Sequence, residues 1–482
     1  MPMPLDHFYL GYSLLQKLKN NEFIPYLLIG AFWGSVYYIQ EDALIYARVV
    51  ENSSLFTWQY NQNEVYASTT SIFWFSIINT IHKISYIPIT WILRLASLFV
   101  SIMIIYKLST IVPLKDKITL LLSYSFLIIS IYGMETALVV YFMLSLATAD
   151  KRKISNCRSQ VLLLTLSLLI RPDLIIFSLI YLILALQKTA VKKKLLLCAT
   201  PISALLYVGF CFTIFGTFLP PSVLAKSQAY STSVSLLTNL NSLIHFPIFL
   251  PEVSFLFGKL SLAINFTLLS CAIWLLKSKN TAMQDKAVIM ASLCYLVSFG
   301  FVSMFPWYVL PPAFLLQTYL MRHSKFKFII AILIILSAPL SLWKLKANEL
   351  KENFRKSIGI EIGSTYRPDQ KILLEPAGYI PFYSGLTAYD TIGLASPTVN
   401  KYRGVNDVDW QKMINDENIE LVLVRSHIGF VKHDTLMNMG FISCNQFLWL
   451  EFKNNQSSFT KQVLTYSNDF DYTLYCKTEE EK

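Results

Sequence analysis

Two adjacent carboxylates, Glu41 and Asp42, follow the first long apolar stretch of the chain. Carboxylates at a membrane boundary are costly to bury, so they usually face water or a functional cavity. In a cavity, a carboxylate can take the proton from an acceptor hydroxyl as that hydroxyl attacks the anomeric carbon of a sugar. Arg48 carries a guanidinium that can hold a phosphate leaving group in bidentate fashion. A solvated helix end explains the same acidic pair without any chemistry, and these residues alone leave both interpretations open.

The segments that must position these residues are apolar enough to cross a membrane. The chain has 482 residues, of which 54% are hydrophobic and 15% are charged, whereas soluble domains are about 45–50% apolar and about 25% charged. This composition excludes an ordinary soluble enzyme, a disordered chain and a disulfide scaffold. A spanning helix needs about 20 residues, or fewer in a hairpin. We therefore predict a polytopic α-helical membrane protein with about eleven transmembrane helices, at residues 23–40, 88–106, 119–132, 134–149, 160–171, 172–187, 194–215, 256–276, 287–304, 307–321 and 327–343.

The positive charge belongs to the apolar part of the chain. The net charge is +11, yet residues 1–343 carry 25 Lys/Arg against 12 Asp/Glu, and residues 344–482 carry 16 against 18. The basic clusters lie between apolar segments, as the positive-inside rule predicts for cytoplasmic loops. With the N-terminus in the cytoplasm every such cluster lies inside, which keeps the first loop, residues 41–87, outside. The charge therefore indicates membrane topology and argues against nucleic acid as a partner.

The composition changes after the last apolar segment. A charged, helix-like stretch at Lys344–Lys356 is followed by short apolar runs separated by turn residues, which is typical of a small α/β domain. We divide the chain into two parts: a transmembrane domain, residues 1–343, and an extracytoplasmic α/β domain, residues 344–482. Of the seven cysteines, Cys444 and Cys476 lie in the outer domain, where a disulfide is chemically allowed; two reduced buried thiols are the alternative. No Cys/His spacing indicates zinc, so no metal site is predicted.

The acidic pair begins a series of short sequence blocks that resembles a known enzyme family. The blocks are Glu41–Asn52, Tyr60–Glu64, Thr70–Trp74, Tyr132–Leu138, Arg171–Asp173, Phe215–Lys226, Trp307–Pro311 and Glu375–Leu394. Their order is similar to that of GT-C-fold membrane glycosyltransferases. It most resembles the branch that contains the bacterial terminal arabinofuranosyltransferases, which use polyprenyl-phosphate sugars. Because Glu41 stands where the family usually has Asp, the resemblance leaves the base open between Glu41 and Asp42.

The resemblance implies roles for residues in several of these blocks. Glu41 or Asp42 would be the catalytic base. A charge at membrane depth is costly, which favours functional roles for Glu135 and Arg171; a helix-end carboxylate and a turn held by Asp173 are the simpler interpretations. Arg48, Arg171 or Lys226 would stabilise the departing phosphate. The residues assigned to substrate binding are Arg48, Asn52, Tyr60, Glu64, Trp74, Glu135, Arg171, Asp173, Lys226, Trp307 and Tyr308.

The function implied by the resemblance is transfer of a sugar from a polyprenyl-phosphate donor to an extracytoplasmic glycan, lipid or protein acceptor of the cell envelope, with inversion. The lipid-linked sugar is a substrate, so no cofactor is predicted, and the sequence is compatible with a divalent metal. The expected location is the bacterial inner (cytoplasmic) membrane. Two alternatives stay open. A lipid or sugar transporter or flippase would share the many spans, although it more often shows repeated halves, and a cell-surface polysaccharide ligase would use a diphosphate-linked donor.

Overall fold

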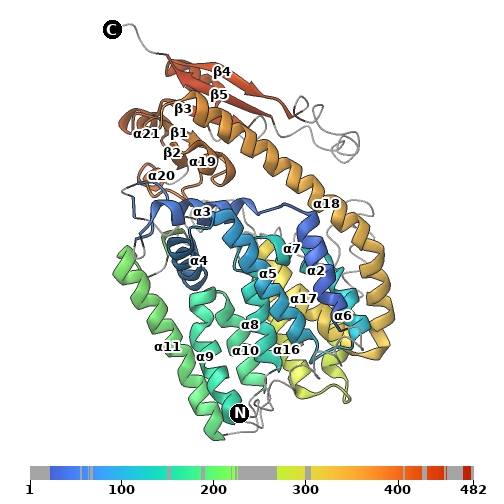
Figure 1. Cartoon of the computed structure of the whole chain (residues 1–482). Coiled ribbons are helices and arrows are strands. Elements are labelled where there is room, and N and C mark those ends of the chain that lie inside the picture. The colour runs from blue at the N-terminus through green and yellow to red at the C-terminus, as the bar shows by residue number, and fades with distance from the viewer. Residues whose placement is uncertain are drawn as a thin grey trace, which may run out of the picture.

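The computed structural model describes residues 22–54, 57–62, 64–65, 69–148, 154–185, 190–218, 220–222, 225, 269–298, 306–404, 408–425, 431–449, 452 and 471–478. A bundle of helices forms most of the molecule, and a small domain with a β-sheet lies against one end of the bundle (Figure 1). The bundle contains α2 (Ile24–Ser35), α5 (Ile89–Leu108), α6 (Leu114–Leu121), α7 (Tyr124–Ile131), α8 (Thr136–Thr148), α9 (Ile154–Ile170), α10 (Leu174–Ala185), α11 (Ala190–Phe215), α16 (Met283–Ser298) and α17 (Pro306–Arg322). Two helices of the first loop, α3 (Glu41–Asn52) and α4 (Ile72–Ser85), pack beside each other, and α3 crosses the end of the bundle that faces the domain.

The described residues contain two helices that are long and apolar enough to cross a membrane: α5 and the stretch Lys327–Thr365 of α18 (Ser324–Thr365). The pair α7 and α8, bent by 120°, would make a third if it counts as one broken span. The predicted number of eleven spans is therefore not confirmed. The stretch predicted as one span at 119–132 is split between α6 and α7, because Ser123 ends one helix and caps the next by accepting a hydrogen bond from the Phe126 amide.

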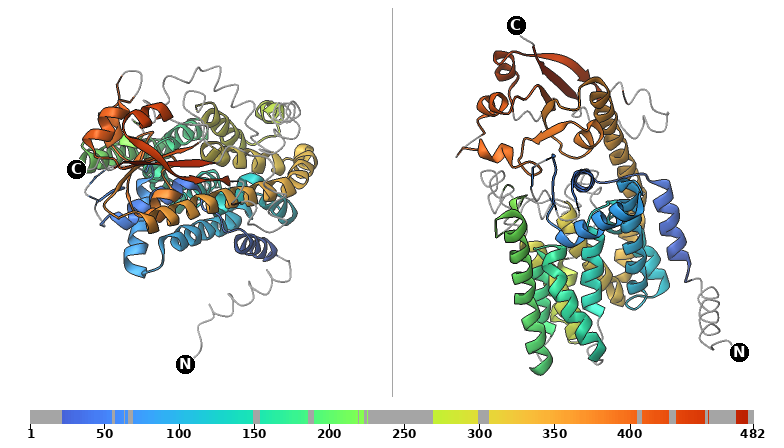
Figure 2. Two further views of the ribbon diagram at one scale, coloured as in Figure 1. Left: turned by 90° about the horizontal axis from the view of Figure 1, so that it is seen from above. Right: turned by 60° about the vertical axis from the view of Figure 1, so that its left-hand side comes forward.

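Helix α18 connects the bundle to the small domain (Figure 2). It is one helix of 42 residues, so the domain boundary predicted between residues 343 and 344 lies inside it. Its apolar first half packs along α6, α7 and α17, and its charged second half packs against α19 (Tyr379–Ser384) of the small domain. The change in composition thus marks where the helix leaves the bundle, and the helix itself continues.

The small domain contains β1 (Lys371–Leu374), β2 (Thr387–Asp390), α20 (Thr398–Lys401), α21 (Trp410–Asp416), β3 (Leu421–Arg425), α22 (His433–Asn438), β4 (Phe441–Phe447) and β5 (Tyr472–Lys477). Its five strands form one sheet in the order β2-β1-β3-β5-β4. Strand β1 pairs with β2 and β3 in parallel, whereas β5 pairs with β3 and β4 in antiparallel fashion. Alternate residues of β1 face opposite sides: Ile372 and Leu374 join the core with α18 and α19, and Leu373 joins the core with α20, α21 and α22. Helices therefore cover both faces.

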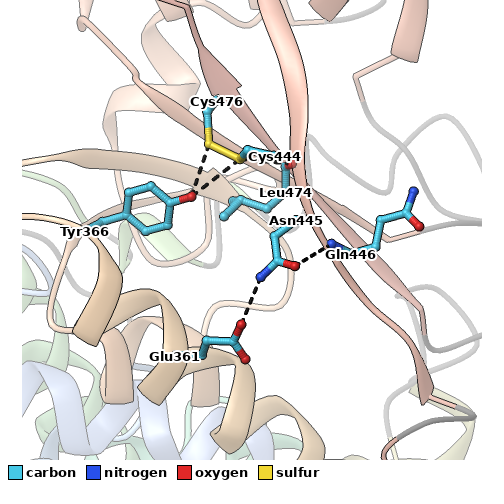
Figure 3. Close-up of a disulfide and its surroundings, with 7 residues drawn as sticks. All are labelled: Glu361, Tyr366, Cys444, Asn445, Gln446, Leu474 and Cys476. Atoms are coloured by element: carbon cyan, nitrogen blue, oxygen red, sulfur yellow. Dashed lines mark hydrogen bonds between the residues drawn. A yellow bond between two sulfur atoms is a disulfide. The ribbon is translucent and has the colours of Figure 1, made fainter.

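Cys444 of β4 and Cys476 of β5 form the disulfide that the sequence allowed (Figure 3). Cys444 lies at the register shift between Ser443 and Asn445, and the Tyr366 hydroxyl lies 3.2 Å from the Cys476 sulfur. The bridge joins the edge strand β4 to its neighbour, β5.

Reducing this disulfide is expected to destabilise the small domain by about 3–4 kcal/mol, because the bridge closes a loop of 32 residues. Thermal unfolding of the full chain with and without a thiol reductant measures the effect. A Cys444→Ser/Cys476→Ser variant should unfold like the reduced protein and should not respond to reductant. A variant as stable as the oxidised wild type would contradict the prediction.

Glu375, the residue that follows β1, is a largely buried carboxyl group. Burial and, next to it, the Asp390 carboxylate raise the pKa of Glu375 from its ordinary value of 4.5 to about 7. The folded protein therefore holds a proton on Glu375 in a pH range where the unfolded chain has released it. The stability contributed by this proton is fully present below about pH 4.5 and is lost as the pH rises through 7. At high pH the loss in the free energy of unfolding reaches about 3 kcal/mol.

Glu375→Gln, which keeps the shape and removes the titration, is therefore expected to raise the apparent Tm at pH 8 relative to wild type and to change it little near pH 4.5. Thermal unfolding over this pH range is the measurement. The same difference in Tm between variant and wild type at both pH values would show that titration of Glu375 is not the cause.

Candidate active site

The acidic pair begins α3, the helix between the bundle and the small domain. Gln40, in an extended conformation, precedes the helix, and Glu41 and Asp42 occupy its first turn, where carboxylates are favoured by the helix dipole. The apolar side chains of Ala43 and Leu44 are fully buried. Successive residues of a helix point about 100° apart, so the two carboxylates face different neighbours.

The Glu41 carboxylate binds the small domain. The Glu41 side chain is 11% exposed. Its Oε1 accepts hydrogen bonds from the backbone amides of Gly378 at 2.6 Å and Tyr379 at 3.0 Å, and its Oε2 accepts from Arg355 of α18 at 3.0 Å. A Cβ atom on Gly378 would collide with the Glu41 carbonyl oxygen, so only glycine fits there. Arg355 also pairs with Glu352 at 3.1 Å. Glu41 therefore fastens α3 to α18 and α19.

Arg48 is also used for contacts with the small domain. The residue is 5% exposed, and its Nε donates to the Tyr60 carbonyl at 3.0 Å. Nη1 donates to the Pro381 carbonyl, and Nη2 donates to the Leu386 carbonyl at 2.5 Å and to Asn61 Oδ1 at 3.0 Å. Nε, Nη1 and Nη2 thus all have protein partners where the first loop meets the small domain.

Three further polar residues of the first loop, Asn52, Tyr60 and Glu64, lie at or beside this contact. Asn52 donates to the Tyr60 carbonyl at 2.6 Å, and the Tyr60 hydroxyl donates to the Ala377 carbonyl at 2.6 Å. Glu64 accepts from Thr398 at 2.7 Å and from Ser396 at 3.0 Å. The side chains of Glu41, Arg48, Tyr60 and Glu64 thus hold the small domain; we call them the docking residues.

Asp42 instead lines a cavity where the helix bundle, the first loop and the small domain meet. The cavity contains about 420 Å³ of space outside the atoms, including open solvent at its mouth. It has two carboxylates, Asp42 and Glu135, several hydroxyl groups and the aromatic side chains of Trp307 and Tyr308. Its lining residues are Asp42, Ile45, Tyr46, Thr69, Thr70, Met134, Glu135, Ser222, Trp307, Tyr308 and Leu394.

Glu135 is held by a residue that the sequence analysis did not assign. The Tyr46 hydroxyl donates to Glu135 Oε2 at 3.0 Å. Burial and the neighbouring Glu135 carboxylate raise the pKa of Tyr46 well above its ordinary value, so its hydroxyl keeps the proton that it donates. Tyr46 lies one helical turn after Asp42, where side chains share a face; this spacing was the signal in the sequence that could have identified it.

Arg171 lies behind the cavity wall and is paired. Its Nε and Nη2 donate to the two oxygens of Asp173 at 2.9 Å and 2.6 Å, and Nη1 donates to the Trp307 carbonyl at 3.2 Å. The guanidinium also lies 4.6 Å from the centre of the Tyr308 ring, and the Tyr295 hydroxyl donates to Asp173. Arg171 and Asp173 therefore orient the two aromatic residues that line the cavity.

The other assigned residues are Trp74 and Lys226. Trp74 is buried, and its indole nitrogen donates to the Gly133 carbonyl at 3.2 Å, two residues before Glu135. Lys226 lies outside the described residues. Within the described parts of the chain, no three His, Cys, Asp or Glu side chains converge on a point that could hold a metal ion.

The small domain contributes Leu394 to the lining of the cavity. Leu394 lies in a turn whose backbone amides donate to the Asp390 carboxylate.

Comparison with known proteins agrees with this architecture. A family model described as a domain of unknown function, DUF8728, matches residues 346–475, and no curated protein matches the sequence. The structure is similar to two crystal structures of ArnT from Cupriavidus metallidurans, one bound to undecaprenyl phosphate and one in the apo state. In both comparisons the identity is 11% and the TM-score 0.56, over 96% of this chain and 99% and 98% of the ArnT chains. ArnT is a GT-C glycosyltransferase, and the chain therefore has a GT-C fold.

Proposed function

We propose that the chain is an integral-membrane glycosyltransferase that moves a sugar from a polyprenyl-phosphate donor to an acceptor hydroxyl. The observation that carries the proposal is the position of Asp42, which lines a cavity beside the bundle together with Glu135, whereas Glu41 is bound to the small domain. The GT-C fold supports the transferase, and the undecaprenyl phosphate bound to ArnT supports a polyprenyl-phosphate donor. The proposed location is the bacterial inner (cytoplasmic) membrane. With the N-terminus in the cytoplasm, the cavity lies on the extracytoplasmic side of that membrane.

In this proposal Asp42 is the general base. It takes the proton of the acceptor hydroxyl as the hydroxyl oxygen bonds to the anomeric carbon. The bond from that carbon to the phosphate oxygen breaks, and the lipid phosphate leaves with the electron pair. Attack opposite the leaving group inverts the anomeric centre. Glu135, Trp307 and Tyr308 line the same space and would bind the sugar, with Lys226 retained as the phosphate ligand proposed from sequence.

The proposal is tested with purified protein in lipid nanodiscs and radiolabelled polyprenyl-phosphate sugars. The resemblance to the arabinofuranosyl branch makes the arabinofuranose donor the first to supply, with a cell-envelope glycan as acceptor. Consumption of the lipid-linked sugar with formation of a labelled glycan is the expected result. Movement of the lipid-linked sugar across the bilayer without cleavage would support a flippase in its place.

A further inference from the structure

Helix α4 has two stripes of different chemistry beside its buried face. The helix packs against α3, α5 and α9, and its buried residues are Ile72, Trp74, Phe75, Ile78 and Asn79. The first stripe is apolar and consists of Phe73, Ile77, Ile81 and Ile84. The second stripe is polar and exposed and consists of Ser76, Thr80 and Lys83. Residues three and four positions apart share a helix face, so each stripe runs along the helix, as in helices that lie at a membrane surface.

The apolar stripe becomes more exposed toward the C-terminal end of α4. Phe73 and Ile77 are half-buried, Ile81 is 40% exposed and Ile84 is 72% exposed. Tyr86, which ends the helix, is 94% exposed. Leaving such apolar side chains in water is costly, and tyrosine is favoured at membrane–water interfaces because it joins an apolar ring to a polar hydroxyl. This end of α4 is therefore suited to contact with lipid.

The stripe continues into the exposed surface of α5, which is long and apolar enough to cross a membrane. Ile87 and Pro88, both exposed, are the two residues between Tyr86 and α5. The rings of Trp91, in the first turn of α5, and Tyr37 lie 6.0 Å apart, and such aromatic groups gather at membrane surfaces. The C-terminal end of α4 is therefore at the level where α5 enters the membrane. The large exposed residues of α5 recur every three or four positions, as on a face that contacts lipid: Trp91, Leu95, Phe99, Ile102 and Tyr106.

We propose that α4 lies in the surface of the membrane leaflet on the side of the small domain, where α3 and α4 are found (Figure 1). Its apolar stripe contacts the acyl chains at the end that carries Ile81 and Ile84. Its polar stripe faces the lipid headgroups and water. The partner of this surface is the phospholipid layer, because the stripe is continuous with the exposed face of a helix that can span the membrane.

The position of α4 sets the depth of the proposed active site. Thr69 and Thr70 line that cavity and come just before α4 in the chain. The indole nitrogen of Trp74, on α4, donates to the Gly133 carbonyl, two residues before Glu135. Two parts of the cavity wall are thus attached to α4, which places the cavity near the level of the lipid phosphates. A polyprenyl-phosphate donor would present its phosphate at this level. Only this last step rests on the proposed function, whereas the contact of α4 with lipid does not.

The test locates spin labels on the full chain in nanodiscs of phosphatidylethanolamine and phosphatidylglycerol. Each label is attached to one introduced cysteine, after the cysteines outside the disulfide have been replaced. Molecular oxygen concentrates in lipid and a nickel chelate stays in water, so the ratio of their collision rates with the label reports its depth. We expect this ratio to be several-fold higher for Ile84→Cys, on the apolar stripe, than for Thr80→Cys, one turn earlier on the polar stripe.

Two reference labels calibrate the ratio. Phe99→Cys, on the exposed face of α5, marks lipid, and Arg367→Cys, on the surface of the small domain, marks water. The ratio for Ile84→Cys should lie close to that for Phe99→Cys. A ratio equal to that for Arg367→Cys would overturn the proposal, and so would a label at this position that neither oxygen nor nickel reaches, because protein would then cover the stripe.

The outcome is independent of sugar transfer. The labels are measured without donor or acceptor, so a protein that transfers no sugar can still show α4 in lipid, and an active protein can still show it in water. Thermal unfolding of each labelled protein confirms that the compared variants are folded. A high ratio for both Ile84→Cys and Thr80→Cys would contradict the surface position, because a helix immersed in lipid has no side that faces water.

Discussion

Replacing Asp42 with asparagine is expected to lower kcat for sugar transfer about 1000-fold and to leave the protein folded. The amide keeps the size of the carboxylate and cannot accept the proton of the attacking hydroxyl, and a positioned general base contributes about 10²–10⁴ in rate. Asp42 lines the cavity, whereas its neighbour Glu41 makes the hydrogen bonds to Gly378, Tyr379 and Arg355. Stability should therefore change little. Single-turnover transfer from a labelled lipid-linked sugar, with a thermal unfolding curve for each protein, is the measurement.

Glu41→Gln is the matched control, because it makes the same chemical change one residue earlier. Its amide oxygen can still accept from Gly378 and Tyr379, whereas the ion pair with Arg355 is lost. We expect a lower Tm and a much smaller loss of kcat than for Asp42→Asn. The opposite pattern, with Glu41→Gln inactive and Asp42→Asn active, would move the base to Glu41.

The sequence located the acidic pair and could not say which carboxylate faces the reaction. Adjacent helical residues point in different directions, and the direction of each matters only when the position of the small domain is known. That position depends on contacts between residues more than 300 apart in the chain, such as Glu41 with Gly378. Local spacing carries no information about such pairs, which is why Arg48, Tyr60 and Glu64 were assigned to substrate and are found at the docking contact.

The fold was more predictable, because it follows from composition and periodicity. An apolar helical part followed by an α/β domain is what the structure shows, and the paired cysteines are in the predicted domain. The domain boundary was placed by the change in charge. No glycine or proline occurs from Leu340 to Ile358, so nothing in this stretch ends a helix, and α18 continues through the boundary. Charge content and helix termination are separate signals, and only the second one sets where a helix ends.

Arg48→Leu is expected to release the small domain from the bundle. The substitution leaves the carbonyls of Tyr60, Pro381 and Leu386 without their donor in a buried contact. Leaving a buried acceptor without its donor costs about 1–3 kcal/mol for each group. We expect a clearly lower Tm and faster hydrogen exchange at residues 379–390. The Tm and the exchange rates of Arg48→Lys should lie between those of wild type and Arg48→Leu, because an ammonium keeps the charge and loses the planar fork of the guanidinium.

Arg367→Leu is the control for loss of an arginine, because Arg367 is on the surface of the same domain with 70% of its side chain exposed; its Tm and exchange should match wild type. Transfer by Arg48→Leu should fall together with domain contact, and conditions that restore the contact, such as lower temperature, should restore part of the activity. A different outcome would assign Arg48 to binding the phosphate of the lipid-linked donor. If Arg48→Leu keeps the Tm and the exchange pattern of wild type and still loses transfer with a raised KM for the lipid-linked donor, the guanidinium binds substrate and the docking role is wrong.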